Sequence, residues 1–286
     1  MEKYMQRTKT LVEALPYIQQ FNNKVIVIKY GGSAMIDEQL KTSVIQDISL
    51  MKLVGMKPVV VHGGGNRISK MLRMMGKEPK FIQGLRVTDD ETMEIAEMVL
   101  SGSVNKSIVQ LFHNQGLKAV GISGKDGKTI TAEKKLLDGV DIGWVGEIKK
   151  ISPELLYSLI KEDFIPVIAP IACDEKNNTY NINADYVAFA VAAELKAEKL
   201  IYMTDVEGVL KDIHDKNSLI SKIKIEEIQQ LIQSNIIDGG MIPKIQCCAD
   251  SIKKGVSSVH ILDGRVEHSL LLEVFTDTGI GTMILP

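Results

Sequence analysis

Two lysines beside glycines are the side chains of this sequence best suited to chemistry. Lys29 lies in the segment Val27–Ser33 (VIKYGGS), and Lys244 lies in the segment Gly239–Lys244 (GGMIPK). A cation next to exposed backbone N–H groups suits a phosphoryl group. Pro243 fits the first turn of a helix, which would place Lys244 at the positive end of that helix. The two segments therefore predict that both lysines bind one phosphoryl group.

A second glycine turn, His62–Asn66 (HGGGN), also follows an apolar, strand-like run. Consecutive glycines let backbone N–H groups approach an anion or a carbonyl oxygen without obstruction by Cβ atoms. Neither this turn nor the turn at Lys29 matches the Walker A pattern or the GxGxxG pattern. A flexible turn and a solvated lysine are the alternatives. Because Lys29 ends a strand, where open α/β sheets bind ligands, we favour the functional interpretation.

Arg86 is the third candidate and lies in the segment Gly84–Asp89 (GLRVTD). Its planar guanidinium suits bidentate recognition of a carboxylate. The acidic residues that follow would begin a helix with Thr88 or Asp89 as its N-cap. A solvated surface arginine is the alternative, and spacing alone leaves both open.

Asn181, Asn183 and Asp185 occupy alternate positions of a fourth segment (NINAD). In an extended chain, alternate side chains share one side, so the two amides and the carboxylate would face together. The amides would bind a substrate and Asp185 would orient nearby lysines. The alternative is that Asp185 only caps the next helix.

Short apolar runs alternate with longer amphipathic stretches. The predicted strands are Val25–Lys29, Pro58–His62, Lys118–Ile122, Ile165–Ala169, Leu200–Thr204 and Ser258–Leu262. They are apolar throughout, as expected for strands covered on both faces. Helical spacing appears in the groups Leu40/Val44/Ile48/Met51, Ile68/Met71/Leu72/Met75 and Val187/Val191/Leu195. This alternation predicts an α/β fold with a mostly parallel sheet between helices.

Two regions interrupt the alternation. The stretch 128–150 reads as a hairpin, and the polar stretch 174–178 reads as a turn that joins two strands. No repeat or low-complexity linker divides the chain. We expect one domain over residues 1–286, with a helical extension (1–23), a first lobe (about 24–180) and a second lobe (about 181–286).

Composition excludes several classes of function. The formal net charge is −2 and aromatic residues make up only 5% of the chain, so no nucleic-acid-binding surface is expected. The apolar runs are too short to span a membrane, and the N-terminus lacks a signal peptide. The three cysteines, two of them adjacent, predict buried free thiols rather than disulfides or a metal site. We expect a cytoplasmic protein.

The segment before Val25 predicts a separate helix. Leu11, Leu15 and Ile18 fall on one helical face, and Phe21 widens it. This helix either packs on its own subunit or docks on a neighbouring one.

Taken in order over 25–284, these segments resemble the amino-acid kinase family. The GLRVT and NINAD segments resemble those members that phosphorylate N-acetyl-L-glutamate. The resemblance implies a three-layer αβα sandwich whose first lobe holds the acyl amino acid and whose second lobe holds ATP. The implied reaction, the second step of arginine biosynthesis in the family, transfers phosphate from MgATP to the side-chain carboxylate. Mg²⁺ would be bound mainly through the ATP phosphates.

The resemblance also assigns roles to individual residues. Lys29 and Lys244 would neutralise the transferring group, and Asp185 would hold both ammonium groups. The expected substrate-binding residues are Gly64, Gly65, Arg86, Asn181 and Asn183. Gly32 and Gly65 would also donate N–H groups to the transferring phosphoryl group. The expected ATP-binding residues are Gly31, Gly32, Thr204, Asp205, Gly208, Val209 and Met241.

The N-terminal helix and the stretch 267–282 resemble the arginine-inhibited members of the family. Those members form hexamers, as trimers of dimers, with this helix interlaced between subunits. We therefore expect a hexamer inhibited by L-arginine; an insensitive dimer is the alternative. The expected arginine-binding residues are Tyr17, His268, Glu273, Gly279 and Gly281. Some relatives are controlled by a PII protein, but no residue here demonstrates that contact.

Two other interpretations remain open at this stage. The first is a sibling kinase that acts on glutamate, aspartate, carbamate or a nucleoside monophosphate. The second is a non-catalytic amino-acid sensor on the same fold. The set Lys29, Asp185 and Lys244 argues against a sensor, which has no need for it.

Overall fold

The computed structural model describes residues 1–286, except for the side chains of Glu2, Lys3, Gln6, Arg7 and Lys216. The chain divides into two compact units. Unit 1 contains Met1–Ile26, Gly32–Pro58 and Lys196–Pro286, and unit 2 contains Val27–Gly31 and Val59–Leu195. Strands β1 (Val25–Tyr30) and β2 (Lys57–His62) contribute residues to both units.

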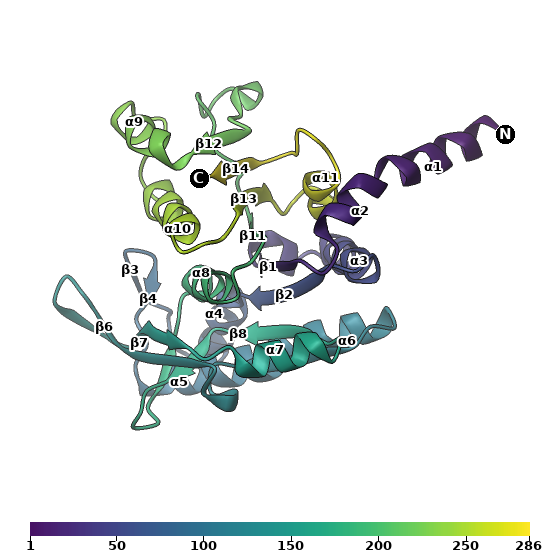
Figure 1. Ribbon diagram of the computed structural model, residues 1–286. Helices are drawn as coiled ribbons and strands as arrows, with labels where there is room; N and C mark the ends of the chain where they lie inside the picture. The colour runs from purple at the N-terminus through teal and green to yellow at the C-terminus, as the bar shows by residue number, and fades with distance from the viewer. The chain divides into compact units, whose positions relative to one another are not determined.

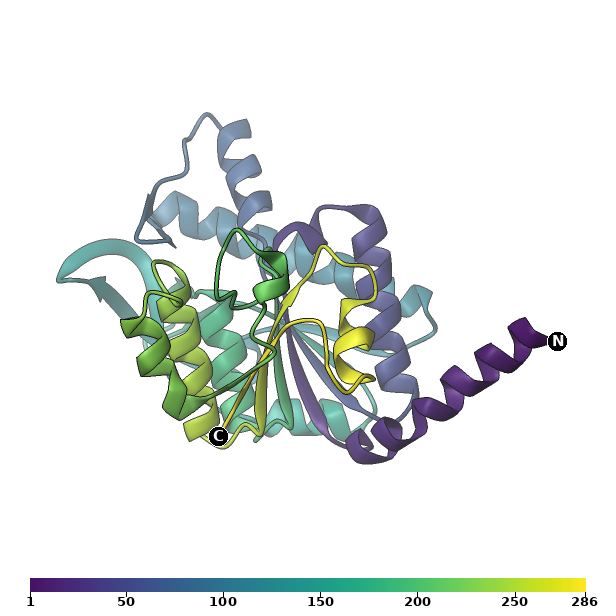
Figure 2. The same cartoon turned by 90° about the horizontal axis from the view of Figure 1, so that it is seen from above.

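Unit 1 contains four hydrogen-bonded strands in the order β12–β14–β13–β11 (Figure 1). Their bounds are β11 (Lys199–Thr204), β12 (Lys222–Lys224), β13 (Ser258–Asp263) and β14 (Thr282–Leu285). The strands are parallel except that β13 and β14 run antiparallel. The helices of unit 1 are α1 (Glu2–Glu13), α2 (Leu15–Phe21), α3 (Glu38–Leu53), α9 (Ile228–Gln233), α10 (Met241–Lys253) and α11 (Ser269–Val274). Figure 2 shows α10 and α11 on opposite sides of the unit 1 strands.

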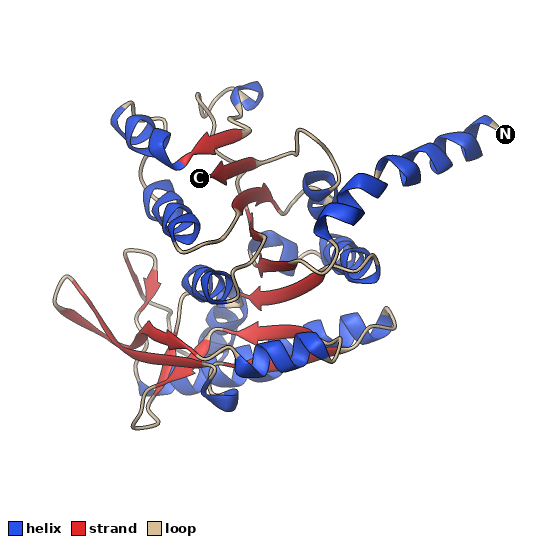
Figure 3. Cartoon of the chain, viewed as in Figure 1, coloured by secondary structure: helices blue, strands red, loops and turns tan.

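Unit 2 contains the parallel strands β2, β8 (Ile165–Ala169) and β5 (Ala119–Ser123), with β8 in the middle. Its helices are α4 (Gly65–Met74), α5 (Asp90–Glu97), α6 (Asn105–Asn114), α7 (Glu154–Lys161) and α8 (Ala184–Glu194). A π-helical segment, Met98–Val104, joins α5 to α6. The remaining strands are β3 (Phe81–Ile82), β4 (Leu85–Arg86), β6 (Ile130–Leu137), β7 (Val140–Ile151), β9 (Ile171–Cys173) and β10 (Thr179–Asn181) (Figure 3).

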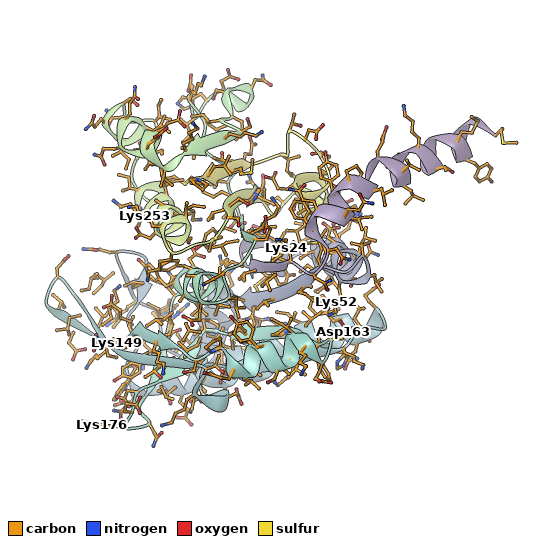
Figure 4. All side chains as sticks on the ribbon, viewed as in Figure 1. Lys24, Lys52, Lys149, Asp163, Lys176 and Lys253 are labelled. Atoms are coloured by element: carbon orange, nitrogen blue, oxygen red, sulfur yellow. The ribbon has the colours of Figure 1, made fainter. Side chains whose placement is uncertain are left out.

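The predicted α/β fold and all six predicted strands are confirmed. Every residue of β8, β11 and β13 is buried, which explains why these strands are mostly apolar rather than alternating, with polar side chains such as Lys199 and His260 buried among them. The predicted hairpin is the antiparallel pair β6–β7, whose outer face carries an ion pair between Lys149 and Glu133 (2.7 Å; Lys149 is labelled in Figure 4). The predicted turn 174–178 joins β9 to β10, and the three cysteines are buried free thiols.

The structure differs from expectation at two boundaries. The N-terminal segment forms two helices rather than one, because Pro16 lies in the first turn of α2 and cannot donate a hydrogen bond to continue α1. The change from unit 2 to unit 1 comes at Leu195–Lys196, so α8 belongs with the strands before it. The two units are also discontinuous in sequence, since 32–58 groups with the C-terminal part of the chain. None of the helices within the described residues is long and apolar enough to cross a membrane.

Candidate active site

A pocket of about 230 Å³ in unit 2 gathers all five residues predicted to bind the substrate. Its walls come from the glycine turn after β2, from β4, from the end of β10 and from the start of α8. The lining includes Gly64, Gly65, Arg86, Asn181 and Asn183. Residues more than a hundred positions apart in the sequence therefore face one cavity.

Arg86 is the only guanidinium among the residues that line this pocket, and it is 7% exposed. Its Nη2 donates to the carbonyl oxygen of Gly65 (2.8 Å) and to Oγ of Ser69 (2.9 Å), and its guanidinium stacks 4.6 Å from the centre of the Phe81 ring. Its Nη1 is buried and lacks a hydrogen-bond partner among the described residues. Burial and the nearby charge of Arg73 lower the pKa of Arg86. A buried unpaired cationic donor is costly, so the geometry favours an anionic ligand at Nη1.

The glycine turn leads directly into α4, which begins at Gly65. The N–H groups of a first helical turn have no partner inside the helix and suit an anion. A Cβ atom on Gly64 would lie 2.5 Å from Cδ2 of Leu100. A side chain at position 64 would therefore displace Leu100, and glycine lets the turn lie this close to the segment that follows α5.

Lys29 and Asp185 form an ion pair within unit 2, with 3.0 Å between Nζ and Oδ1. Lys29 comes from β1, and Asp185 comes from the first turn of α8. The N-cap of α8 is Asn183, whose Oδ1 accepts the N–H of Asp185 (2.8 Å). The capping alternative for Asp185 is therefore wrong, and its carboxylate faces the lysine as predicted.

In unit 1, the turn after β1 packs against the end of β11. Gly32 has a positive φ of 66°, and a Cβ atom there would lie 2.6 Å from Oδ1 of Asp205. The same oxygen accepts the N–H of Ser33 (2.8 Å). The side chain of Asp205 thus fixes the glycine turn from the end of the neighbouring strand. Gly31 follows β1 directly and belongs to unit 2.

The loop after β11 is held by two threonines. Oγ1 of Thr204 donates to a backbone carbonyl, and Oγ1 of Thr282 accepts the N–H of Val209 (2.8 Å). Gly208 has φ +145°, and a Cβ atom there would lie 2.6 Å from Oγ1 of Thr282. This loop is therefore ordered by side chains of unit 1. Met241 is the first residue of α10.

Lys244 follows in the first part of α10, where Pro243 lies in the first turn as predicted. The N-terminal end of a helix attracts phosphate, and lysine adds a full positive charge to it.

Tyr17, His268 and Glu273, three of the residues predicted to bind arginine, hold the C-terminal segment of unit 1 in place, and Tyr17 and His268 are described first. The hydroxyl of Tyr17 donates to the carboxylate of Asp277, and its ring packs edge-on against Phe275. His268 is hydrogen-bonded to Oδ1 of Asp47 (2.6 Å). Helix α2 therefore contacts the segment that contains Phe275 and Asp277.

Glu273 has a different environment from the one expected for a residue that faces an effector. It is buried, and its carboxylate accepts hydrogen bonds from Nδ1 of His260 (2.6 Å) and from the N–H groups of Ile280 (2.7 Å) and Gly281 (3.2 Å). Burial raises the pKa of Glu273, but these hydrogen bonds outweigh it and lower the pKa. Gly279, with φ +64°, leaves room for the carboxylate. Glu273 thus orders the stretch 279–281 and is already paired with His260.

Sequence reasoning missed two residues that shape the pocket, Ser69 and Phe81. Ser69 lies four positions after Gly65 on α4, so helical spacing puts it on the same face and was a usable signal. Phe81 comes from the short strand β3, and no local pattern marks its stacking on Arg86.

Comparison with known proteins shows that the chain belongs to the amino acid kinase family. The model of the amino acid kinase family matches residues 24–263. The chain is 54% identical to acetylglutamate kinase of Carboxydothermus hydrogenoformans, with 100% of each chain covered.

Two solved structures share the fold. One is N-acetylglutamate synthase from Neisseria gonorrhoeae complexed with coenzyme A and N-acetyl-glutamate (TM-score 0.85, 27% identity, 98% of this chain covered). This chain spans 63% of the length of that synthase. The other is carbamate kinase from Giardia lamblia bound to AMP-PNP (TM-score 0.66, 16% identity, 92% and 98% of the two chains covered), a likeness of fold alone.

Proposed function

Because the chain belongs to the amino acid kinase family, we propose that it transfers a phosphoryl group from ATP to the side-chain carboxylate of N-acetyl-L-glutamate. The product would be N-acetyl-L-glutamyl 5-phosphate. The observation that carries the proposal is the buried, unpartnered Nη1 of Arg86 in a pocket of suitable size. An acceptor with a second carboxylate satisfies that donor, whereas carbamate has only the one carboxylate that would receive the phosphoryl group.

The other polar groups of the pocket suit the rest of this acceptor. Asn181 and Asn183 offer amide groups to an N-acetyl amide, and Gly64 offers a backbone N–H. The apolar side chains of Ile68, Leu100 and other lining residues leave an apolar wall for the methylene groups. These features support an acylated dicarboxylic amino acid over a nucleoside monophosphate.

The proposed chemistry needs charge stabilisation but no general base. A carboxylate is already ionised at neutral pH, so its oxygen can attack the γ-phosphorus directly while the bond to ADP breaks. Catalysis then consists of positioning and electrostatic stabilisation. Lys29, held by Asp185, and Lys244, at the start of α10, would neutralise charge on the transferring group.

The residues of unit 1 that were expected to border ATP fit a phosphate-bearing ligand. Gly32 adopts a conformation that favours glycine, and the packing of Asp205 leaves no room for a Cβ atom there. Mg²⁺, when bound, would supply further positive charge to the phosphates. We propose that the ATP phosphates provide most of its ligands. Among the side chains described, no group of three or more His, Cys, Asp or Glu residues is placed to hold a metal ion.

A coupled assay of ADP release tests the proposal. We expect turnover with N-acetyl-L-glutamate, and little with glutamate, aspartate, carbamate or a nucleoside monophosphate. Preference for one of these sibling acceptors would overturn the assignment, and binding without any turnover would favour a non-catalytic sensor.

We also propose that L-arginine inhibits the enzyme and that the chain assembles as a hexamer. The contact between Tyr17 and the segment 275–277 supports a link between the N-terminal helices and the predicted arginine site. Deletion of residues 1–22 should remove both inhibition and hexamer assembly, as measured by kinetics with arginine and by light scattering. A truncated protein that remains hexameric and arginine-sensitive would refute this proposal.

A further inference from the structure

A buried histidine and a buried asparagine lie directly behind the glycine turn of the pocket. His62 ends β2 and Asn105 begins α6, and both are fully buried. Nδ1 of His62 lies 2.7 Å from the carbonyl oxygen of Gly63, and Nε2 lies 3.1 Å from Nδ2 of Asn105. A carbonyl oxygen only accepts hydrogen bonds, so the proton of the neutral ring belongs on Nδ1. Nε2 then accepts a hydrogen bond from the amide of Asn105.

Hydrogen bonds that lead to two strands hold the side-chain amide of Asn105 in place. Its Nδ2 also donates to the carbonyl oxygen of Val167 in β8 (2.9 Å), and its Oδ1 accepts from Nζ of Lys106 (3.1 Å). Nζ of Lys106 donates in addition to the carbonyl oxygen of Gly121 in β5 (2.8 Å). These partners leave only one orientation of the amide. The glycine at 121 makes room for it, because a Cβ atom there would lie 1.7 Å from Oδ1 of Asn105.

The π-helical segment Met98–Val104 supports the same turn by packing. Leu100 and Val104 are the nearest neighbours of a Cβ atom built on Gly64, at 2.5 and 3.4 Å. A π-helical turn is uncommon and often marks a functional site. Here it leads directly into Asn105, so the apolar support and the polar support of the glycine turn come from one continuous piece of chain.

We propose that His62, as the neutral Nδ1–H tautomer held by Asn105, is a positioning residue that aims the N–H groups of the glycine turn into the pocket. The Gly63 carbonyl and the Gly64 N–H belong to one planar trans peptide, so they point in opposite directions. Holding the carbonyl toward His62 therefore turns the Gly64 N–H away from His62. The proposal rests on the proposed function, since it assumes that the turn binds the acceptor and the transferring group.

The electrostatic environment keeps His62 neutral. Burial, with a smaller contribution from the charge of Lys106, lowers the pKa of His62 to about 4, although the hydrogen bond with Gly63 acts in the opposite direction. The imidazole therefore acts as a fixed donor and acceptor at neutral pH rather than as an acid or a base.

Nitrogen NMR of the ¹⁵N-histidine-labelled protein tests the tautomer directly. The chain contains only five histidines. The two ring-nitrogen signals that disappear in the His62→Asn variant are therefore assigned to His62. We expect a neutral ring with its proton on Nδ1 at pH 7. A proton on Nε2, or a ring that is charged at pH 7, overturns the proposal. This measurement is independent of turnover, so a failure of the proposed function would not obscure it.

Two substitutions then separate positioning from packing. The amide of His62→Asn places a donor near the Nδ1 position, whereas that of His62→Gln reaches only the Nε2 position. We expect His62→Asn to retain KM for N-acetyl-L-glutamate within about threefold and His62→Gln to raise it about tenfold or more, since loss of a buried hydrogen bond displaces the turn. His113→Asn is the matched control, because that ring contacts a backbone carbonyl (Ala119, 3.1 Å) in the same unit and outside the pocket.

Melting temperatures of all three variants complete the experiment. Equal KM values for the two His62 variants, or a rise in KM that merely follows the loss of melting temperature as in the control, would overturn the positioning role. No turnover by the unmodified protein with N-acetyl-L-glutamate would instead refute the proposed function.

Discussion

Replacement of Arg86 by lysine should weaken binding of the acceptor without slowing phosphoryl transfer. Nη2 of Arg86 is already used by the Gly65 carbonyl and by Ser69, so Nη1 is the donor left for a ligand. Lysine keeps the positive charge near Phe81 but cannot reproduce the planar fork that serves the protein and the ligand at once. The acceptor should therefore lose one charge-assisted hydrogen bond.

The size of the effect follows from that single bond. A hydrogen bond to a charged group contributes about 1.5–3 kcal/mol. Since each 1.4 kcal/mol or so is tenfold in affinity, KM for N-acetyl-L-glutamate should rise roughly 10- to 140-fold. The bond is equally present before and during transfer, so kcat should stay within about threefold.

The assay is steady-state ADP release with each substrate varied in turn. Arg73→Lys is the matched control, because Arg73 lies on α4 but is mostly exposed and pairs with Glu78 (3.6 Å). We expect this control to leave both KM values unchanged. A fall in kcat at constant KM in Arg86→Lys, or an equal rise in KM for ATP, would refute the reasoning. Melting temperatures measured alongside would expose a variant that is simply unfolded.

Three further predictions concern charge, backbone and pH. Lys29→Ala should lower kcat about a hundredfold or more with little change in melting temperature, because it removes a preorganised charge; a kcat within about tenfold of the original would contradict this. Gly143→Ala should destabilise the fold by at least about 2 kcal/mol in urea titrations, because φ is +84° and the new Cβ atom would lie 2.0 Å from the carbonyl oxygen of Thr88; an unchanged midpoint would disprove the clash. The hydrogen bond with Lys77 lowers the pKa of Asp89 to about 2, whereas the value in the unfolded chain is about 3.9. The ionised carboxylate therefore stabilises the fold above about pH 4, and this stabilisation is lost as the pH falls toward 2. Asp89→Asn should therefore melt below the original protein at pH 7 and equal to it near pH 2, whereas a melting difference independent of pH would exclude the mechanism.

Local sequence pattern was sufficient to find the strands of the framework and the glycine turns, and the resemblance to the family selected the residues expected in the pocket. Strands covered on both faces are mostly apolar, so β8 was visible as an uninterrupted apolar run and β13 as a run broken mainly by His260. Glycine turns after such strands mark places where the backbone must approach another group closely, as it does at Gly32 and Gly64. Short-range rules also narrowed the N-cap of α5 to Thr88 or Asp89, and the structure shows that it is Asp89.

Which distant side chains form ion pairs or hydrogen bonds with one another depended on the tertiary structure. Asp185 was ambiguous in sequence, because a cap and an ion-pair partner look alike until β1 brings Lys29 to it. The buried pair His62 and Asn105, 43 positions apart, had no local signature. Likewise, Glu273 looked available for a ligand until β13 and the stretch 279–281 supplied its partners. Local periodicity depends only on residues that are close in the chain, so helices, strands and turns can be predicted from the sequence. Which polar side chains become buried against one another depends on the order of the strands in the sheet, and the sequence does not show that order.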